Sequence, residues 1–167
     1  MTFAEFEQLP YPEAGKMELV NGEVVTTMPP PKKTHQDIAS NIQEILVQRF
    51  QWKRVRMDHN GYRMGDRSWL EPDVSVTWPD QPVDEGDYFV EAPLIAVEIL
   101  SPGEEIEEKL ALYFGHGARE VWVINPRKKT FSAYVKRGES VTFQQVTDEF
   151  RSEAADGLVI RLSDIFK

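Results

Sequence analysis

A short and almost wholly apolar segment in the middle of the chain limits the possible folds more than any other feature. Residues 94–100, Leu-Ile-Ala-Val-Glu-Ile-Leu, have the composition of a central strand that is buried on both faces. A Ser-Pro-Gly turn ends this strand, residues 104–114 carry a helical pattern closed by Gly115 or Gly117, and a second buried strand follows at 120–124. This order predicts a right-handed β-α-β crossover in which the two strands are parallel.

The segments on either side of the crossover predict further strands. Residues 17–20 and 23–26 predict a hairpin around Asn21-Gly22, because this pair suits the positive φ values of a two-residue turn. The Met-Pro-Pro-Pro run at 28–31 is expected to break any strand and to lead into a helix. The other expected segments are two short strands or a hairpin within 55–69, strands at 74–78, 131–135, 140–146 and 158–160, and an acidic loop at 80–93. Together they predict a single mixed-sheet domain of the α/β or α+β class over residues 1–167.

The longer predicted helix, residues 34–50, carries a histidine on its buried side. Thr34 is the predicted N-cap, and Asp37 three residues later approximates a capping box. An apolar stripe recurs at helical spacing along this segment: Ile38, Ile42, Ile45 and Leu46. At about 100° per residue, His35 projects into that stripe and away from water.

The composition excludes several classes of protein. With 167 residues, 41% of them hydrophobic, the chain is long enough for one core and too apolar to be disordered. Its longest apolar stretch is far shorter than the roughly 20 residues of a membrane-spanning helix, and its acidic N-terminus lacks the features of a signal peptide. The absence of cysteine excludes disulfides, thiolate nucleophiles and zinc fingers, and fits the reducing cytoplasm, where we expect the protein. A net charge of −9 is unfavourable for contacts with phosphates unless some of the carboxylates bind a cation.

Two acidic residues on neighbouring predicted strands suggest a metal site. Glu98 lies within the apolar strand, where an ionised carboxylate is costly unless it is paired or holds a metal. Asp73 opens the preceding strand, and adjacent strands lie about 4.8 Å apart, so the two carboxylates converge on one cation if the strands pair. Oxygen ligands favour Mg²⁺ or Mn²⁺. The alternatives are a Glu98 that reaches solvent or pairs with a structural base, and an Asp73 that only caps the turn after Pro72.

A lysine and a further glutamate are weaker candidates. Lys109 falls at the edge of the apolar stripe of the helix at 104–114, beside Tyr113, where its stem can lie along the core while the ammonium reaches a polar site. The alternative is a surface lysine paired with Glu105. Glu18, in the first strand of the hairpin, is on these grounds a solvent-facing residue. The sequence contains no histidine metal-binding spacing, nucleophile elbow, phosphate-binding loop or dinucleotide fingerprint.

Five blocks of sequence in a fixed order carry a family resemblance. They are Glu18-Leu-Val-Asn-Gly-Glu23, His35 at the start of a helix, Glu71-Pro-Asp73-Val-Ser-Val, Ala96-Val-Glu98-Ile-Leu-Ser-Pro102, and Lys109-x3-Tyr113-x3-Gly117-x2-Glu120-Val-Trp-Val-Ile-Asn-Pro126. The series resembles the putative restriction-endonuclease family, formerly a domain of unknown function and abundant in cyanobacteria, over about residues 3–136. This family belongs to the PD-(D/E)XK nuclease superfamily. The resemblance implies a restriction-endonuclease-like core, in which helices flank a mixed sheet.

The resemblance also implies roles for the residues of a nuclease site. Asp73 is then the Asp of the motif and Glu98 its second acid, both holding Mg²⁺ (or Mn²⁺), and Glu18 completes the metal site. The motif's lysine is expected two residues after Glu98, where Leu100 stands, so its role passes to Lys109 on the next helix. His35 matches the histidine that leads the first long helix, where it assists proton transfer or supports the site.

Some positions depart from the family pattern. Asn125 precedes Pro126 where the family usually has Asp, and Val121 replaces a Tyr. Four glutamates between the two motif blocks make the segment unusually acidic for one that lies near a phosphate: Glu104, Glu105, Glu107 and Glu108.

Two functional hypotheses follow. The first is a Mg²⁺-dependent endonuclease that hydrolyses phosphodiester bonds in DNA, working as a homodimer as many nucleases of the superfamily do. The second is a catalytically silent member that binds nucleic acid or protein. In the first hypothesis a set of basic residues flanks the DNA: Arg54, Arg56, Arg63, Arg67, Arg119, Arg127, Lys128 and Lys129.

Overall fold

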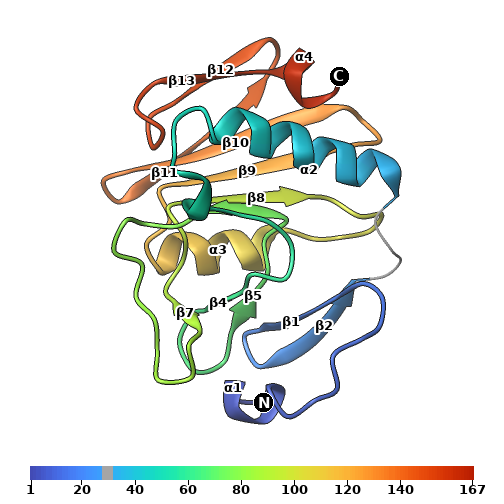
Figure 1. The fold of residues 1–167 in the computed structure, drawn as a ribbon, viewed down its shortest axis with the longest axis vertical. Coiled ribbons are helices and arrows are strands. Elements are labelled where there is room, and N and C mark those ends of the chain that lie inside the picture. Colours follow the sequence, from blue (N-terminus) through green and yellow to red (C-terminus); the bar gives the residue numbers. More distant parts are fainter. Residues whose placement is uncertain (28–31) are drawn as a thin grey trace.

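A six-stranded mixed sheet forms the centre of the molecule (Figure 1). The computed structural model describes residues 1–27 and 32–167, so the predicted break at 28–31 lies outside the described residues. The strands follow the order β11-β10-β9-β8-β6-β3. They are β3 (Val55–Arg56), β6 (Val74–Val76), β8 (Ile95–Ile99), β9 (Glu120–Asn125), β10 (Thr130–Arg137) and β11 (Ser140–Val146). The pair β8–β9 is parallel, as the crossover predicted, and the other neighbours are antiparallel.

Helix α3 (Glu107–Gly115) connects the two parallel strands. It begins three residues later than predicted, because the Glu104 carboxylate accepts a hydrogen bond from the Ser101 backbone N–H and closes a turn before the helix. Of the two glycines predicted to end it, Gly117 is the one with a positive φ, at 106°.

The strand β8 separates two cores that differ in polarity. Ile95, Val97 and Ile99 point into a wholly apolar core beneath helix α2 (Lys33–Leu46). Ala96 points to the opposite side, into a core that α3 shares with a second sheet. Because side chains alternate along a strand, Glu98 is also directed to the α3 side. Glu98 therefore lies under α3.

The prediction for the start and end of α2 was wrong. Lys32 is the N-cap and makes no side-chain hydrogen bond, while Thr34 lies inside the first turn. Asp37 accepts a hydrogen bond from Lys33 Nζ at 2.6 Å instead of closing a capping box. The helix ends at Leu46 and not at residue 50. The buried apolar stripe, which was predicted correctly, positions this helix without the aid of a side-chain cap.

The second sheet has five short strands and lies on the α3 side (Figure 1). Its order is β2-β1-β5-β4-β7, with β1 (Lys16–Val20), β2 (Glu23–Thr27), β4 (Tyr62–Arg63), β5 (Trp69–Leu70) and β7 (Phe89–Val90). The predicted hairpin at 17–26 is confirmed, and β4 and β5 form the hairpin expected within 55–69. The strand β7 lies inside the predicted acidic loop. Helix α1 (Phe3–Phe6) covers this sheet through an aromatic cluster around Trp69.

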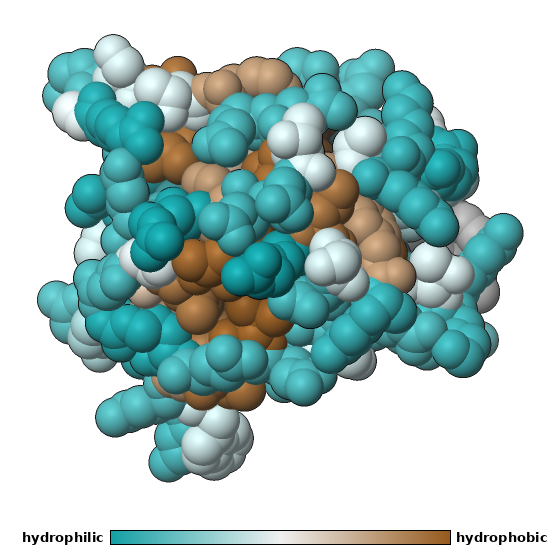
Figure 2. Space-filling model, turned by 90° about the horizontal axis from the view of Figure 1, so that it is seen from above, coloured by the Kyte–Doolittle hydropathy of each residue, from teal (hydrophilic) through white to brown (hydrophobic). Residues whose placement is uncertain are grey.

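The C-terminal segment covers the α2 side. It consists of β12 (Glu149–Ser152), β13 (Leu158–Arg161) and α4 (Leu162–Ile165), of which only β13 was predicted. Asn41 of α2 donates a hydrogen bond to the Ile165 carbonyl at 2.9 Å and ties this segment down. Viewed from this side, the surface is polar at its margin and shows apolar atoms in its middle (Figure 2).

A 3₁₀ turn (Trp52–Arg54) follows α2. In the described part of the chain no helix combines the length and the apolar character that crossing a bilayer requires.

Candidate active site

The two predicted metal ligands meet because β6 and β8 pair. Val74 lies opposite Val97, and the Asp73 N–H donates to the Val97 carbonyl at 3.0 Å, so Asp73 is adjacent to the strand that carries Glu98. Both acids are buried, at 4% and 0% exposed. Glu98 therefore does not reach solvent. Asp73 Oδ2 accepts a hydrogen bond from the Ile99 N–H at 2.7 Å, which fixes the carboxylate toward the β8 strand.

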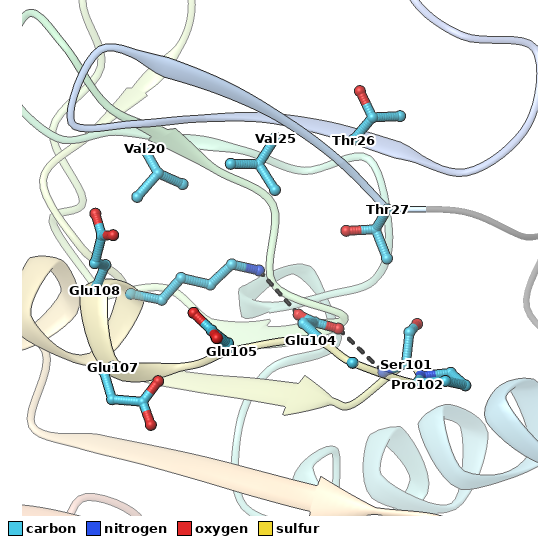
Figure 3. Close-up of a pocket in the computed structure, with 12 residues that line it drawn as sticks. Val20, Val25, Thr26, Thr27, Ser101, Pro102, Glu104, Glu105, Glu107 and Glu108 are labelled. Carbon is cyan, nitrogen blue, oxygen red and sulfur yellow. Dashed lines mark hydrogen bonds and ion pairs between the residues drawn. The ribbon is translucent and has the colours of Figure 1, made fainter.

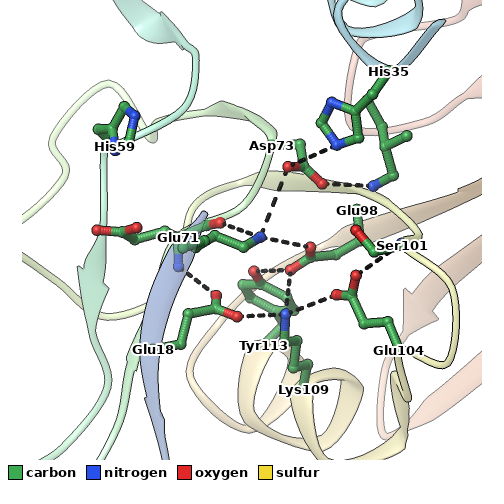
Figure 4. Close-up of polar contacts among 12 residues, drawn as sticks. Glu18, His35, His59, Glu71, Asp73, Glu98, Ser101, Glu104, Lys109 and Tyr113 are labelled. Carbon is green, nitrogen blue, oxygen red and sulfur yellow. Dashed lines mark hydrogen bonds and ion pairs between the residues drawn. The ribbon is translucent and has the colours of Figure 1, made fainter. Parts of the chain in front are cut away.

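The predicted lysine lies between three carboxylates (Figure 4). Lys109 Nζ is 2.6 Å from Glu18 Oε1, 3.1 Å from Glu104 Oε2 and 3.7 Å from Glu98 Oε1. Its side chain is 5% exposed. The alternative of a surface lysine paired with Glu105 is therefore wrong, because Lys109 points inward from α3.

Glu18 also points inward. It is fully buried, and its Oε2 accepts a hydrogen bond from the Glu71 N–H at 2.7 Å while its Oε1 faces Lys109. The interpretation as a solvent-facing strand residue is wrong, since Lys109 of α3 and the backbone of Glu71 cover this side chain. Only the family resemblance indicated its place in the site.

His35 reaches the site from the first turn of α2. Its Nε2 is 3.4 Å from Asp73 Oδ1, and its side chain is 16% exposed, so it contacts the acid pair while keeping some access to solvent. Burial alone would lower the pKa of His35, but the hydrogen bond and charge of Asp73 raise it. The five residues predicted for the site thus lie in one connected cluster, although they come from separate segments of the chain: Glu18, His35, Asp73, Glu98 and Lys109.

Lys16 is the site residue that the sequence interpretation missed. Its ammonium donates a hydrogen bond to the Glu71 carbonyl at 2.9 Å and lies 3.7 Å from both Asp73 Oδ1 and Glu98 Oε2. The signal that could have revealed it is its spacing from Glu18. Residues two apart on a strand share a face, so a Glu18 in the site brings Lys16 to the same side.

The buried charges shift each other's protonation. Burial raises the pKa of Glu98 to about 7, against the opposing charges of Lys109 and Lys16. The pKa of Asp73 is about 2, because Lys16 and then His35 outweigh the effect of burial. The pKa of Lys109 is raised, since the attraction of Glu98 and Glu18 exceeds the cost of burying the ammonium.

The two carboxylate oxygens of Glu98 differ, because one accepts a hydrogen bond and the other does not. Tyr113 donates a hydrogen bond to its Oε1 at 2.7 Å, whereas its Oε2 is buried and has no hydrogen-bond partner in the part of the chain that the structure describes. An unpartnered buried carboxylate oxygen is costly and rare, so it needs an explanation. Its nearest cation is the Lys16 ammonium, which it shares with Asp73.

The acid pair fits a divalent cation. Asp73 Oδ1 and the unpartnered Glu98 Oε2 each lie 3.7 Å from the Lys16 ammonium, so both oxygens face one position, and carboxylate oxygens are the ligands that Mg²⁺ and Mn²⁺ prefer. Across residues 1–27 and 32–167, no group of three or more His, Asp or Glu side chains is placed to hold a metal ion. Two carboxylates with an otherwise open shell suit Mg²⁺, which usually keeps several waters or substrate oxygens.

Two hollows lead to this cluster. A groove of about 650 Å³ runs between the β1–β2 hairpin and the start of α3 (Figure 3). Lys109 is one of the residues that line it. Its α3 wall carries the four glutamates of the acidic segment: Glu104, Glu105, Glu107 and Glu108. A smaller cavity of about 80 Å³ exposes Lys16, His35 and Asp73. None of the eight basic residues predicted to flank DNA lines either hollow.

Comparisons with known proteins agree with this fold. The family model Uma2, described as putative restriction endonuclease, matches residues 3–163. The crystal structure of a putative nuclease belonging to DUF820 from Anabaena variabilis ATCC 29413 superposes with a TM-score of 0.79 at 23% sequence identity, covering 99% of this chain and 97% of that one. A search of curated proteins gives no match. The restriction-endonuclease-like fold expected from the sequence is confirmed, and the chain belongs to the Uma2 family of putative restriction endonucleases.

Proposed function

We propose that this protein is a nuclease that uses a divalent cation, Mg²⁺ or Mn²⁺, to hydrolyse phosphodiester bonds in DNA. One observation carries the proposal: five residues from five separate segments form one cluster, and one of them, Glu98, is a buried carboxylate whose Oε2 has no hydrogen-bond partner among the described residues. Membership of a family described as putative restriction endonucleases supports the same chemistry. Three carboxylates and the Lys109 ammonium are buried here, which is costly and typical of a site kept for function.

Asp73 and Glu98 would hold the cation through Oδ1 and Oε2. Bound there, the cation would lower the pKa of a water molecule and offset the charge that develops on the phosphate. Tyr113 holds the other oxygen of Glu98, so the carboxylate presents Oε2 in a fixed direction. The Ile99 N–H holds Asp73 Oδ2 in the same way. His35 Nε2 lies 3.4 Å from Oδ1, the oxygen that would face the cation, and acts as a positioning residue for that oxygen.

Lys109 and Glu18 act as a pair in this proposal. The Lys109 ammonium contacts Glu18 at 2.6 Å and lies near Glu98 Oε1, the oxygen that Tyr113 holds. It therefore neutralises Glu98 from the side away from the proposed cation. Glu18 is in turn fixed by the Glu71 N–H. The main role of Glu18 in this proposal is therefore to orient Lys109, and any contact between Glu18 and the cation is secondary.

The acidic wall of the larger groove favours the second hypothesis, a catalytically silent module. Glu105, Glu107 and Glu108 are exposed along this groove and repel a phosphate backbone. A silent member of the family would keep the cluster for stability alone. The two hypotheses differ in one measurable property, which is metal-dependent cleavage that requires Glu98.

The test is relaxation of a supercoiled plasmid with Mg²⁺ or Mn²⁺, beside EDTA, a single-stranded DNA and an RNA. We expect cleavage by the wild-type protein in metal and none in EDTA. Asp73→Asn and Glu98→Gln should reduce the rate at least about a hundredfold. Glu139→Gln, which removes the same charge from an exposed turn, is the matched control and should keep the wild-type rate. Equal cleavage by Glu98→Gln would contradict the proposal.

A further inference from the structure

Lys16 occupies a distinctive position between the two proposed metal ligands. Its Nζ is 3.7 Å from Asp73 Oδ1 and 3.7 Å from Glu98 Oε2, the same two oxygens that face the proposed cation. We propose that Lys16 competes with the divalent cation for this oxygen pair and thereby sets the cation affinity of the site. This inference rests on the proposed function, because it concerns the regulation of the same site.

The two lysines of the cluster lie on different sides of Glu98. Lys109 approaches Oε1, the oxygen that already accepts from Tyr113, and it also contacts two other carboxylates. Lys16 approaches Oε2, which has no hydrogen bond. Lys109 therefore stays paired when a cation binds at Oε2, whereas Lys16 directly opposes that cation.

The way in which Lys16 is held permits such an exchange. Within residues 1–27 and 32–167 its one hydrogen bond is to a backbone carbonyl, that of Glu71, and it has no direct hydrogen bond to either acid. Its side chain is 15% exposed and lines the smaller cavity, in contrast to the 5% exposed Lys109. A flexible lysine stem with an opening beside it can move its ammonium aside without breaking an ion pair at hydrogen-bond distance.

The electrostatic consequence has a definite sign. An ammonium ion close to the two ligand oxygens repels a divalent cation and already neutralises part of their charge. Removal of that charge leaves Asp73 and Glu98 without a counter-ion on the Oε2 side. A variant that lacks the ammonium should therefore bind the cation more tightly, even where the proposed catalysis is impaired.

The experiment measures Mn²⁺ binding directly, by the loss of the free-ion electron paramagnetic resonance signal and by calorimetry. Wild type is compared with Lys16→Met, Lys16→Arg and Lys33→Met, the last of which removes a charge from an exposed lysine near His35. We expect Lys16→Met to bind Mn²⁺ about tenfold more tightly or better, and the other two to bind as wild type. The added affinity should disappear in the double variant Lys16→Met, Glu98→Gln.

Unchanged or weaker Mn²⁺ binding by Lys16→Met would overturn the inference while the proposed metal site stands. Absence of binding in every protein would overturn both the inference and the metal-dependent function. If Lys16→Met unfolds without a cation, refolding on addition of Mn²⁺ supports the inference, because the cation then replaces the ammonium. Failure of Mn²⁺ to refold it would mean that Lys16 has a structural role that no cation takes over, and the inference would be wrong.

Discussion

Two buried glutamates on adjacent parallel strands have opposite surroundings. Glu98 on β8 and Glu120 on β9 are 0% and 1% exposed. Glu120 accepts hydrogen bonds from Trp122 Nε1 at 3.0 Å, Ser152 Oγ at 2.8 Å and the Ala154 N–H at 2.7 Å. Glu98 has one hydrogen bond and depends on two lysines for the rest of its neutralisation.

The difference separates a structural acid from the one that we propose to be reactive. Both oxygens of Glu120 are satisfied by fixed, neutral donors, and two of these donors belong to the C-terminal segment that Glu120 anchors. Within the described residues Glu120 forms no ion pair with a lysine or arginine. Glu98 instead keeps Oε2 free of hydrogen bonds, beside the Lys16 ammonium at 3.7 Å. Burial alone therefore does not distinguish the two carboxylates, whereas the type of their partners does.

The largest expected effect comes from removing the lysine that neutralises the Glu98 cluster. Lys109→Met leaves Glu18 and Glu98 buried beside an apolar group, and breaking a buried ion pair from one side costs about 3–5 kcal/mol of unfolding free energy. Urea denaturation with a circular dichroism readout measures this loss. A loss below about 1 kcal/mol would mean that water screens the charges of Glu18 and Glu98, and it would contradict their burial in a dry cluster.

Neutral substitution of each glutamate sharpens the comparison. Glu120→Gln replaces an acceptor by a donor that faces other donors, so we expect a loss of about 1–3 kcal/mol in unfolding free energy. Glu98→Gln should cost less than this, because it removes a charge whose burial is unfavourable. The folded fraction of Glu120→Gln should cleave DNA at the wild-type specific rate, while Glu98→Gln does not. Loss of DNA cleavage in both variants would show that the two acids form one functional unit.

Two buried tyrosines give a smaller and more selective test. Tyr113→Phe removes the hydrogen bond to Glu98 Oε1, and Tyr62→Phe removes a hydrogen bond of equal length, 2.7 Å, to Ser75. Each change should lower the unfolding free energy by about 1 kcal/mol. Only Tyr113→Phe should weaken Mn²⁺ binding, since it alone frees the Glu98 carboxylate. Equal effects of both variants on Mn²⁺ affinity would contradict the positioning role of Tyr113.

The smallest effect concerns the acidic wall of the groove. Glu105→Gln with Glu107→Gln removes two exposed charges near the site, so binding of a DNA duplex by a cleavage-deficient Glu98→Gln background should tighten about threefold to tenfold at low salt. The stability should change by less than about 0.5 kcal/mol. Fluorescence anisotropy at two salt concentrations measures the effect. Unaltered affinity would mean that DNA does not pass along this groove.

The sequence was most informative where local pattern and long-range packing agree. The segment around Leu94 predicted a buried strand, and the parallel pairing of β8 with β9 follows from the helix between them. The second sheet was predicted only in part, because strands of two residues are too short for any periodicity and form through tertiary pairing. The strand β12 and helix α4, of four residues each, were also missed because they are too short for a clear periodicity.

The sequence predicted more of the candidate site than of the fold around it. Asp73 and Glu98 were found from the cost of a charge in an apolar strand and from strand spacing, whereas Glu18 and His35 came from the resemblance. Lys16 was missed because a lysine at the start of a strand looks like an ordinary surface residue. Its role depends on the Glu71 carbonyl, and no sequence pattern reports a contact of that kind.

The most direct test of the central claim is the anomalous difference map of a crystal soaked in Mn²⁺. The account predicts one peak within about 2.5 Å of both Asp73 Oδ1 and Glu98 Oε2, with the Lys16 ammonium moved away from that point and no peak at Glu120. Well-diffracting crystals that show no peak at the acid pair, or a peak only among the exposed glutamates of the groove, would contradict it.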